Sequence, residues 1–271
     1  MSLGASLGIT LGVLVVYMTL GWLLSLWRKD ASVVDPLWGL GFIVAAVSYF
    51  LLLDGLTGRK ILTLVMVAAW GLRLSAYLLW RNRGRGEDPR YRAMRAKRPS
   101  SFWWYSYFQV FLLQALLLWL VAAPIAGAMS RPLGGGSAPG FNGLDFVGGA
   151  VWLFGLCWEV AGDTQLALFK RDPANKGKVM QTGAWRYTRH PNYFGEAVLW
   201  WGVWLVAAAA GGYWSVYGPV VITMLLLRVS GVTLLEKGLA DSKPGYREYV
   251  ERTSAFIPWP PRRAHDPGTP D

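Results

Sequence analysis

The sequence predicts an all-α, polytopic membrane protein with seven transmembrane helices, and three observations support that fold class. Of the 271 residues, 54% are hydrophobic and only 16% are charged, whereas soluble domains carry about 25% charged residues. Several apolar runs reach the roughly 20 residues that a helix needs to cross a bilayer. Lys and Arg gather in alternate loops, as they do on the cytoplasmic side of membrane proteins.

Seven apolar segments account for most of the chain. They are Leu7–Leu26, Val33–Leu53, Ile61–Trp80, Trp104–Met129, Leu144–Phe169, Phe194–Ala210 and Val216–Leu235. No positive charge precedes the first segment, which argues against a secretory signal peptide. The loop Pro132–Asn142 contains a run of three glycines, so we expect a flexible connector. We expect residues 1–258 to form a single membrane domain and residues 259–271 to form a polar, disordered tail.

The orientation follows from the distribution of positive charge. Of the 27 Lys and Arg residues, 23 lie after the first, third and fifth predicted spans or from Arg228 onward. Positively charged loops stay in the cytoplasm, so the N-terminus is predicted to lie outside and the C-terminus in the cytoplasm. An odd number of spans is required for that arrangement.

Composition also excludes some functions. The net charge of +11 is explained by membrane topology, so we expect no nucleic-acid partner. Cys157 is the only cysteine, and His190 and His265 are the only histidines. These numbers predict neither a disulfide framework nor a metal site.

Carboxylates within the spans are candidate functional groups, because ionisable residues in a membrane are costly and usually face a cavity or a partner. Glu159 and Asp163 are one helical turn apart and therefore share a face, shortly before Lys170 and Arg171. Near a helix end, Arg228 has the alternative of reaching the membrane interface as a structural residue.

The segment Gln181–Glu196 has the densest group of polar residues in the sequence. Pro191 suits the first turn of a helix, and the N–H groups of a helix N-terminus attract anions. Because Arg189 and His190 precede that turn, we expect a phosphate-bearing ligand. Asn192 and Glu196 are four residues apart, and together they can recognise a carboxamide group. Contact with anionic lipid headgroups is the alternative for this loop.

Two further groups lie at predicted cytoplasmic ends. Arginines between Arg81 and Arg98, including Arg85, can bind phosphate bidentately, although the topology rule alone explains many of them. Asp35 opens the second predicted span as an N-cap candidate followed by Pro36. At the edge of an apolar cavity it could instead stay protonated and donate a hydrogen bond to a carbonyl oxygen.

From Asp35 to Pro258, the chain resembles the membrane steroid 5α-reductase family, specifically its bacterial homologues. The matching segments are Glu159–Asp163, Lys170–Pro173 with Lys178, Asn192–Glu196, Arg73 with Tyr77, Asn82–Arg85, and Tyr246–Tyr249 through Pro258. The chain departs from the family in three places. Glu159 replaces a common asparagine, Trp70 falls near the family's tyrosine partner, and Val229–Thr233 has no histidine.

The resemblance implies NADPH bound from the cytoplasm and reduction of a Δ4-3-ketosteroid, or a similar apolar enone, to the 5α-saturated ketone. The implied catalytic residues are Asp35, Tyr77 and Glu196, and the implied substrate-binding residues are Trp38, Trp70 and Tyr77. The implied cofactor-binding residues are Asn82, Arg85, Asp163, Lys170, Arg171, Lys178, Tyr187, Arg189, His190, Asn192, Tyr193, Glu196, Arg228 and Tyr246. We expect a monomer in the bacterial inner membrane, among membrane lipids, whose steroid-like substrate enters from the lipid.

Two alternatives stay open. Isoprenylcysteine and phospholipid methyltransferases, which use S-adenosylmethionine, share the pattern of Arg189–Gly195. Because S-adenosylmethionine has no phosphate, the number of phosphate-binding groups favours NADPH. A lipid- or sterol-binding protein without catalytic activity would need the apolar spans but no phosphate pocket.

Overall fold

The computed structural model describes residues 1–55, 57–130, 140–229 and 244–262. Within these ranges the regular structure is entirely helical, apart from an isolated bridge between Thr188 and Ser254. The all-α prediction is therefore confirmed for the described part of the chain. The α-helices are α1 (Leu3–Arg28), α2 (Val34–Leu52), α3 (Gly58–Asn82), α4 (Pro89–Lys97), α5 (Phe102–Ser106), α6 (Leu113–Val121), α7 (Ala123–Met129), α8 (Gly143–Arg171), α9 (Pro191–Ala209), α10 (Tyr217–Met224) and α12 (Tyr246–Arg252).

The chain divides into two compact units. Unit 1 contains Met1–Gly148 and Val203–Gly218, and unit 2 contains Gly149–Gly202 and Pro219–Asp271. The prediction of a single membrane domain over residues 1–258 stays a prediction.

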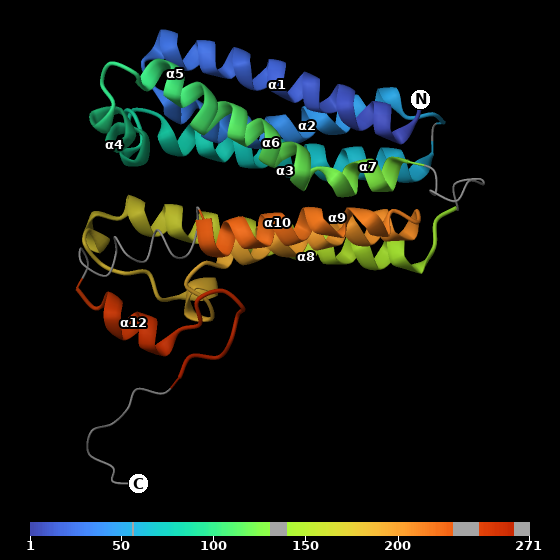
Figure 1. The fold of residues 1–271 in the computed structure, drawn as a ribbon. Coiled ribbons are helices and arrows are strands. Elements are labelled where there is room, and N and C mark those ends of the chain that lie inside the picture. The colour runs from blue at the N-terminus through green and yellow to red at the C-terminus, as the bar shows by residue number, and fades with distance from the viewer. Residues whose placement is uncertain (56, 131–139, 230–243, 263–271) are drawn as a thin grey trace. The chain divides into compact units, whose positions relative to one another are not determined.

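In unit 1, α2 packs against both α1 and α3, while α6 packs against α1, and α7 against α2 and α3 (Figure 1). The interior is apolar and aromatic, because these helices turn their large hydrophobic side chains toward one another. Leu14, Phe42, Trp70, Phe111 and Leu118 are almost completely buried. The packing of these side chains holds the helices of unit 1 together, and the polar groups of this unit lie at the ends of the helices.

Five helical segments are long and apolar enough to cross a membrane. They are Leu3–Arg28, Ala31–Leu52, Gly58–Asn82, Phe102–Met129 and Gly143–Arg171. They coincide with the first five predicted spans, so the membrane character of the protein is confirmed.

The sixth and seventh predicted spans are not among these five segments. The sixth corresponds to α9. The seventh corresponds to α10 and the π-helix Leu225–Val229, and the remainder of this span lies outside the described residues. The predicted connector Pro132–Asn142 and the predicted disordered tail lie mostly outside them as well.

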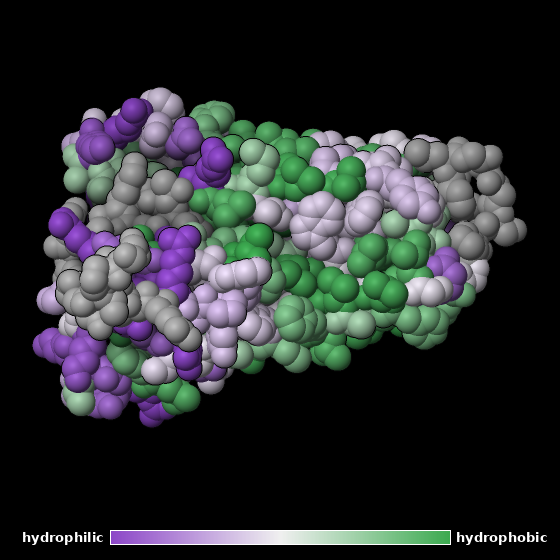
Figure 2. Space-filling model, turned by 90° about the horizontal axis from the view of Figure 1, so that it is seen from below, coloured by the Kyte–Doolittle hydropathy of each residue, from purple (hydrophilic) through white to green (hydrophobic). Residues whose placement is uncertain are grey.

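The surface of the helices is apolar, as lipid contact requires. Large hydrophobic side chains stand exposed along α1, α2 and α3, for example Leu20, Leu51 and Leu72. On the face drawn in Figure 2, hydrophobic residues extend across the middle and hydrophilic ones gather at one end. Exposed leucines at this density are unusual in a protein surrounded by water, which agrees with the membrane assignment.

The fourth predicted span is helical but irregular. Between α5 and α6 it contains a π-helix, Tyr107–Leu112, and α6 ends at Val121 before α7 continues with Pro124 in its first turn. Proline lacks the N–H that a continuous helix would use at this point. The sequence period alone does not predict the π-helix.

A buried ion pair holds the end of unit 1 at which α3 and α8 begin. Arg59 Nε donates to Asp145 Oδ1 at 2.7 Å, and Arg59 Nη2 donates to Asp145 Oδ2 at 2.7 Å and to the Gly140 carbonyl at 2.8 Å. The neighbouring Lys60 donates to the carbonyls of Phe50 and Leu53 at the end of α2. Two of the few cations outside the predicted cytoplasmic loops therefore have structural partners.

Candidate functional site

The start of α2 is held firmly against α3, and this contact positions Asp35. A Cβ atom added to Gly39 would lie 2.6 Å from the Gly71 carbonyl oxygen, so the two backbones touch at a point where only glycine fits. Ser75 donates to the Pro36 carbonyl at 2.7 Å, and Tyr17 donates to the Leu37 carbonyl at 3.0 Å. The first turn of α2 therefore has little freedom to move.

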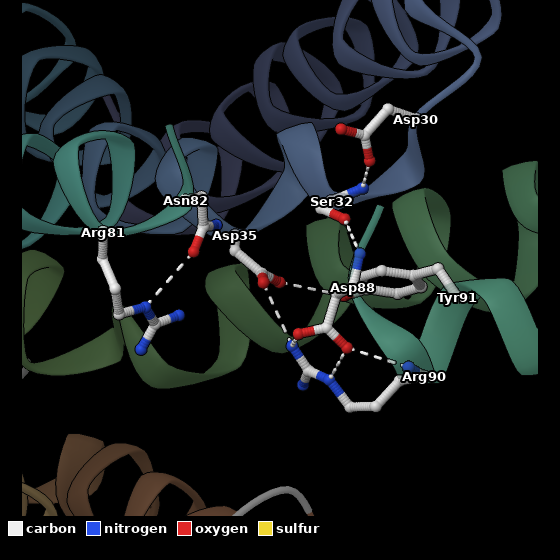
Figure 3. A network of polar contacts seen from close by, with 8 residues as sticks. All are labelled: Asp30, Ser32, Asp35, Arg81, Asn82, Asp88, Arg90 and Tyr91. Carbon is white, nitrogen blue, oxygen red and sulfur yellow. Dashed lines mark hydrogen bonds and ion pairs between the residues drawn. The ribbon is translucent and has the colours of Figure 1, made fainter. Parts of the chain in front are cut away.

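Asp35 lies in a polar network with α4 (Figure 3). The Tyr91 hydroxyl donates to Asp35 Oδ1 at 2.9 Å, and Arg90 Nη2 donates to Asp35 Oδ2 at 3.0 Å. Arg90 also binds Asp88, whose side chain caps the first turn of α4. Both oxygens of the Asp35 carboxylate consequently act as acceptors.

Further contacts hold the loop before α4 against the short helix that precedes α2. The Asp88 N–H donates to Ser32 Oγ at 2.6 Å, and the Ala31 N–H donates to Glu87 at 2.9 Å. Glu87 also pairs with Arg95 at 2.7 Å. Burial opposes ionisation of Glu87, but the hydrogen bonds from Arg95 and Ala31 outweigh burial and hold the pKa of Glu87 below its ordinary value.

The predicted substrate-binding residues lie nearby in unit 1. The rings of Trp38 and Trp70 both contact Phe42, with centroids 5.3 and 5.4 Å apart, and Trp70 is only 1% exposed. Tyr77 lies between the guanidinium groups of Arg73 and Arg81, at 5.4 and 6.0 Å from its ring centroid. Their roles in binding substrate stay predictions.

The two predicted cofactor residues of unit 1 lie at the end of α3. Asn82 Oδ1 accepts a hydrogen bond from Arg81 Nε at 3.2 Å, and Arg85 is exposed in the loop that follows. Arg85 is therefore available to an anionic ligand.

In unit 2, α8 and α9 run antiparallel in close contact through glycines. A Cβ on Gly195 would lie 2.4 Å from the Glu159 nitrogen, and one on Gly155 would lie 2.5 Å from the Leu199 nitrogen. This approach brings Asn192 Nδ2 to 3.1 Å from Asp163 Oδ1, to which it donates. The structure thus brings together two predicted residues that are 29 positions apart in the sequence.

Buried acids lie on α8 and α9 in this contact region. Glu159, Asp163 and Glu196 are 2%, 4% and 9% exposed, which is rare for carboxylates and requires partners. The His190 ring stacks on Tyr193, with centroids 5.5 Å apart and planes 6° apart. Four predicted residues are therefore grouped at the start of α9. His190 directly precedes the helix, and Asn192, Tyr193 and Glu196 lie in its first two turns.

The loop before α9 is tied to the C-terminal segment. Arg189 Nη1 donates to the carbonyls of Val250 and Thr253, and the Tyr249 hydroxyl donates to the Trp185 carbonyl. Through these contacts Arg189 joins the loop before α9 to the C-terminal segment, a role that its positive charge alone does not predict. A role in binding phosphate stays a prediction.

The other predicted cofactor residues differ in their access to ligand. Lys170, Arg171, Lys178, Tyr187 and Arg228 are exposed, whereas Tyr246 is buried against Tyr249. The cations among them are accessible to phosphate, and Tyr246 serves the packing of α12.

Sequence reasoning missed the partners of Asp35. Arg90 lies within the basic segment from Arg81 to Arg98 and Tyr91 follows it, and Asp88 and Pro89 just before them signal the start of a helix. That signal places a helix but does not say what its side chains contact.

Comparison with known proteins gives the family without an activity. A family model described as a protein of unknown function, DUF1295, matches residues 21–253. An uncharacterized protein of Schizosaccharomyces pombe is 26% identical over 268 residues, which cover 88% of this chain and 75% of the relative. No solved structure matches the chain. Because the family model covers most of its length, the chain belongs to the DUF1295 family.

Proposed function

We propose that the protein is an NADPH-dependent reductase that saturates the Δ4 double bond of a 3-oxo-Δ4-steroid or a similar apolar enone. The DUF1295 family includes steroid 5α-reductase-like proteins, which supports this reaction class. Of the residues proposed for the cofactor, Asn82 and Arg85 belong to unit 1 and the others to unit 2, while Asp35, Trp38, Trp70 and Tyr77, proposed for the enone, belong to unit 1.

The observation that carries the proposal is the Asn192–Asp163 hydrogen bond at the start of α9, beside the buried Glu196. A held amide with neighbouring carboxylates suits recognition of a carboxamide, such as that of nicotinamide. Exposed Lys170, Arg171 and Lys178 suit the phosphates of the same molecule. The donor and acceptor groups present therefore fit NADPH, which would supply a hydride.

The proposal includes the membrane arrangement. Seven spans, with the N-terminus outside and the C-terminus in the cytoplasm, place the basic loops on the cytoplasmic side of a bacterial inner membrane. The five apolar helices support the first five of those spans, and α9 and α10 would supply the last two. A monomer with a steroid-like substrate entering from lipid completes the proposal.

An S-adenosylmethionine-dependent membrane methyltransferase is the second candidate. The segment Arg189–Gly195, which the two enzyme types share, opens α9 here. The exposed cations near the end of α8 favour NADPH, because S-adenosylmethionine offers them no phosphate.

The test is the thermal stability of the detergent-purified protein with NADPH or with S-adenosylmethionine, because a ligand that binds only the folded state raises the melting temperature. We expect stabilisation by NADPH, followed by NADPH oxidation with members of a Δ4-3-ketosteroid panel. Stabilisation by S-adenosylmethionine alone would replace the reductase with the methyltransferase. No stabilisation by either would favour a lipid- or sterol-binding protein without catalytic activity.

A further inference from the structure

The cations of α4 and its C-cap fall into two groups. Arg90 and Arg95 form ion pairs with carboxylates of unit 1. Arg92, Lys97 and the C-cap residue Arg98 are exposed, and none of these three forms an ion pair within the described ranges of the chain. The outward side of α4 therefore carries positive charge that the protein itself does not neutralise.

The other side of α4 is held against unit 1, which fixes the place of the exposed cations. Tyr91 is 5% exposed, and the Arg95 guanidinium lies 4.3 Å from the ring centroid of Phe102. Arg95 also pairs with Glu87, which accepts a hydrogen bond from the Ala31 N–H at 2.9 Å. These contacts join α4 to the start of α5 and to the segment that follows α1.

Exposed tryptophans stand at the same end of unit 1. Trp27 and Trp103 are 80% and 57% exposed, and they lie at the ends of the apolar segments Leu3–Arg28 and Phe102–Met129. Trp22 Nε1 donates to the Trp103 carbonyl at 2.8 Å, so the two segment ends lie side by side. Because tryptophan is enriched where a membrane meets water, this end of the two helices is expected at the level of the lipid headgroups.

Further cations adjoin these tryptophans. Arg28 and Lys29 directly follow the tryptophan of α1 and are exposed. The Arg98 guanidinium lies 4.0 Å from the ring centroid of Tyr105 in α5. Figure 1 shows α4 and α5 at the end of unit 1 where α1 ends. We call the five exposed cations the basic interfacial surface: Arg28, Lys29, Arg92, Lys97 and Arg98.

We propose that the basic interfacial surface binds the phosphate groups of anionic phospholipids in the surrounding membrane. An anionic lipid surface attracts Lys and Arg that lie close to it, whereas a zwitterionic headgroup has no net charge to offer them. A lipid is favoured over a soluble anion because the cations lie beside exposed tryptophans, which suit the boundary between headgroups and acyl chains. Lipid binding here would hold for a reductase and for a methyltransferase alike, because none of the five cations is assigned to cofactor or substrate.

The test measures lipid preference of the protein in phosphatidylcholine nanodiscs that contain a small fraction of dansyl-labelled phosphatidylglycerol. Energy transfer from tryptophan to the dansyl group reports labelled lipid beside the protein. Unlabelled phosphatidylglycerol or phosphatidylcholine is then added as competitor. The ratio of the two concentrations that displace the label gives the preference for the anionic lipid.

The variant Arg92→Gln/Lys97→Gln/Arg98→Gln removes three charges from the basic interfacial surface and keeps every tryptophan. Its matched control, Arg247→Gln/Arg252→Gln/Arg262→Gln, removes three charges from exposed residues of unit 2. We expect the first variant to lower the preference by at least about 5-fold, the effect of losing one cation at an anionic surface. The control should keep the preference of wild type.

Salt provides a second measurement that does not depend on folding of a variant. Salt at about 1 M shortens the Debye length to about 3 Å, so it should weaken the preference of wild type for phosphatidylglycerol. A wild-type protein that prefers neither lipid, or whose preference is unchanged by salt, would overturn the proposal. An equal loss of preference in the control variant would overturn it as well, because net charge and not this surface would then attract the lipid.

Discussion

Replacing Arg59 with methionine should destabilise unit 1 strongly. Arg59 and Asp145 join the first turns of α3 and α8, and their side chains are only 4% and 1% exposed. Methionine keeps the length and apolar packing of the arginine stem but removes its charge. Asp145 would then remain buried without its cation.

The magnitude follows from the contacts that are lost. Arg59 donates hydrogen bonds to both Asp145 carboxylate oxygens and to the Gly140 carbonyl, and removing one partner of a buried ion pair costs about 3–5 kcal/mol. Asp145 would keep the hydrogen bond from the Asn142 N–H at 2.9 Å and its favourable place at a helix N-terminus. We therefore expect the lower end, about 3 kcal/mol, which is roughly a 150-fold change in the unfolding equilibrium constant.

The assay is unfolding of the purified protein in detergent, followed by tryptophan fluorescence. Arg59→Met should unfold much more readily than wild type, and the double variant Arg59→Met/Asp145→Leu should recover most of the loss, because no buried charge remains. The control is Asp54→Asn, whose exposed pair with the N-terminus should matter by less than about 1 kcal/mol. Equal stability of Arg59→Met and wild type would refute the assignment of this pair as a structural clamp.

Three further predictions concern α2, the loop before α4 and the proposed cofactor site. Gly39→Val should lower the melting temperature because the added carbons collide with the Gly71 carbonyl. The control Gly12→Val should not, because the space around Gly12 is open. Equal melting temperatures of the two variants would contradict the close contact between α2 and α3. Because the pKa of Glu87 in the folded protein lies below its ordinary 4.5, the stability that Glu87 contributes is complete above that pH and is lost as the pH falls through the lower folded value. Amide exchange of residues 83–101 between pH 6 and pH 3 should show this loosening, and protection that persists at pH 3 would disprove it. Glu196→Ala should weaken NADPH binding in a titration, and unchanged affinity would remove Glu196 from the proposed pocket.

Much of the fold follows from local patterns. Five predicted spans correspond to five apolar helices, because the length of an apolar run and the scarcity of charge within it are properties of contiguous sequence. The caps are also readable: Asp88 before Pro89 begins α4 as a capping residue should. The π-helix Tyr107–Leu112 is not readable, because an apolar run of this composition fits an α-helix equally well.

The candidate site is only partly predictable. Asn192 and Asp163 were both named from the sequence, and the structure brings them together. Arg189 was named for its charge, yet it bonds to backbone carbonyls of the C-terminal segment. A basic residue carries the same charge whether its partner is a phosphate or a carbonyl, so sequence cannot separate these roles.

The sequence by itself determines that this protein is a helical membrane protein with basic loops, because the length of each apolar run and the positions of the charges can be read from contiguous residues. Only the tertiary structure decides that Asp35 meets Arg90 and Tyr91, which lie 55 and 56 positions away. That meeting depends on how α2 packs against α3 at Gly39 and on how the loop before α4 folds back onto Ser32. The strength and direction of a hydrogen bond are set by distances between atoms, and those distances exist only once the helices have packed.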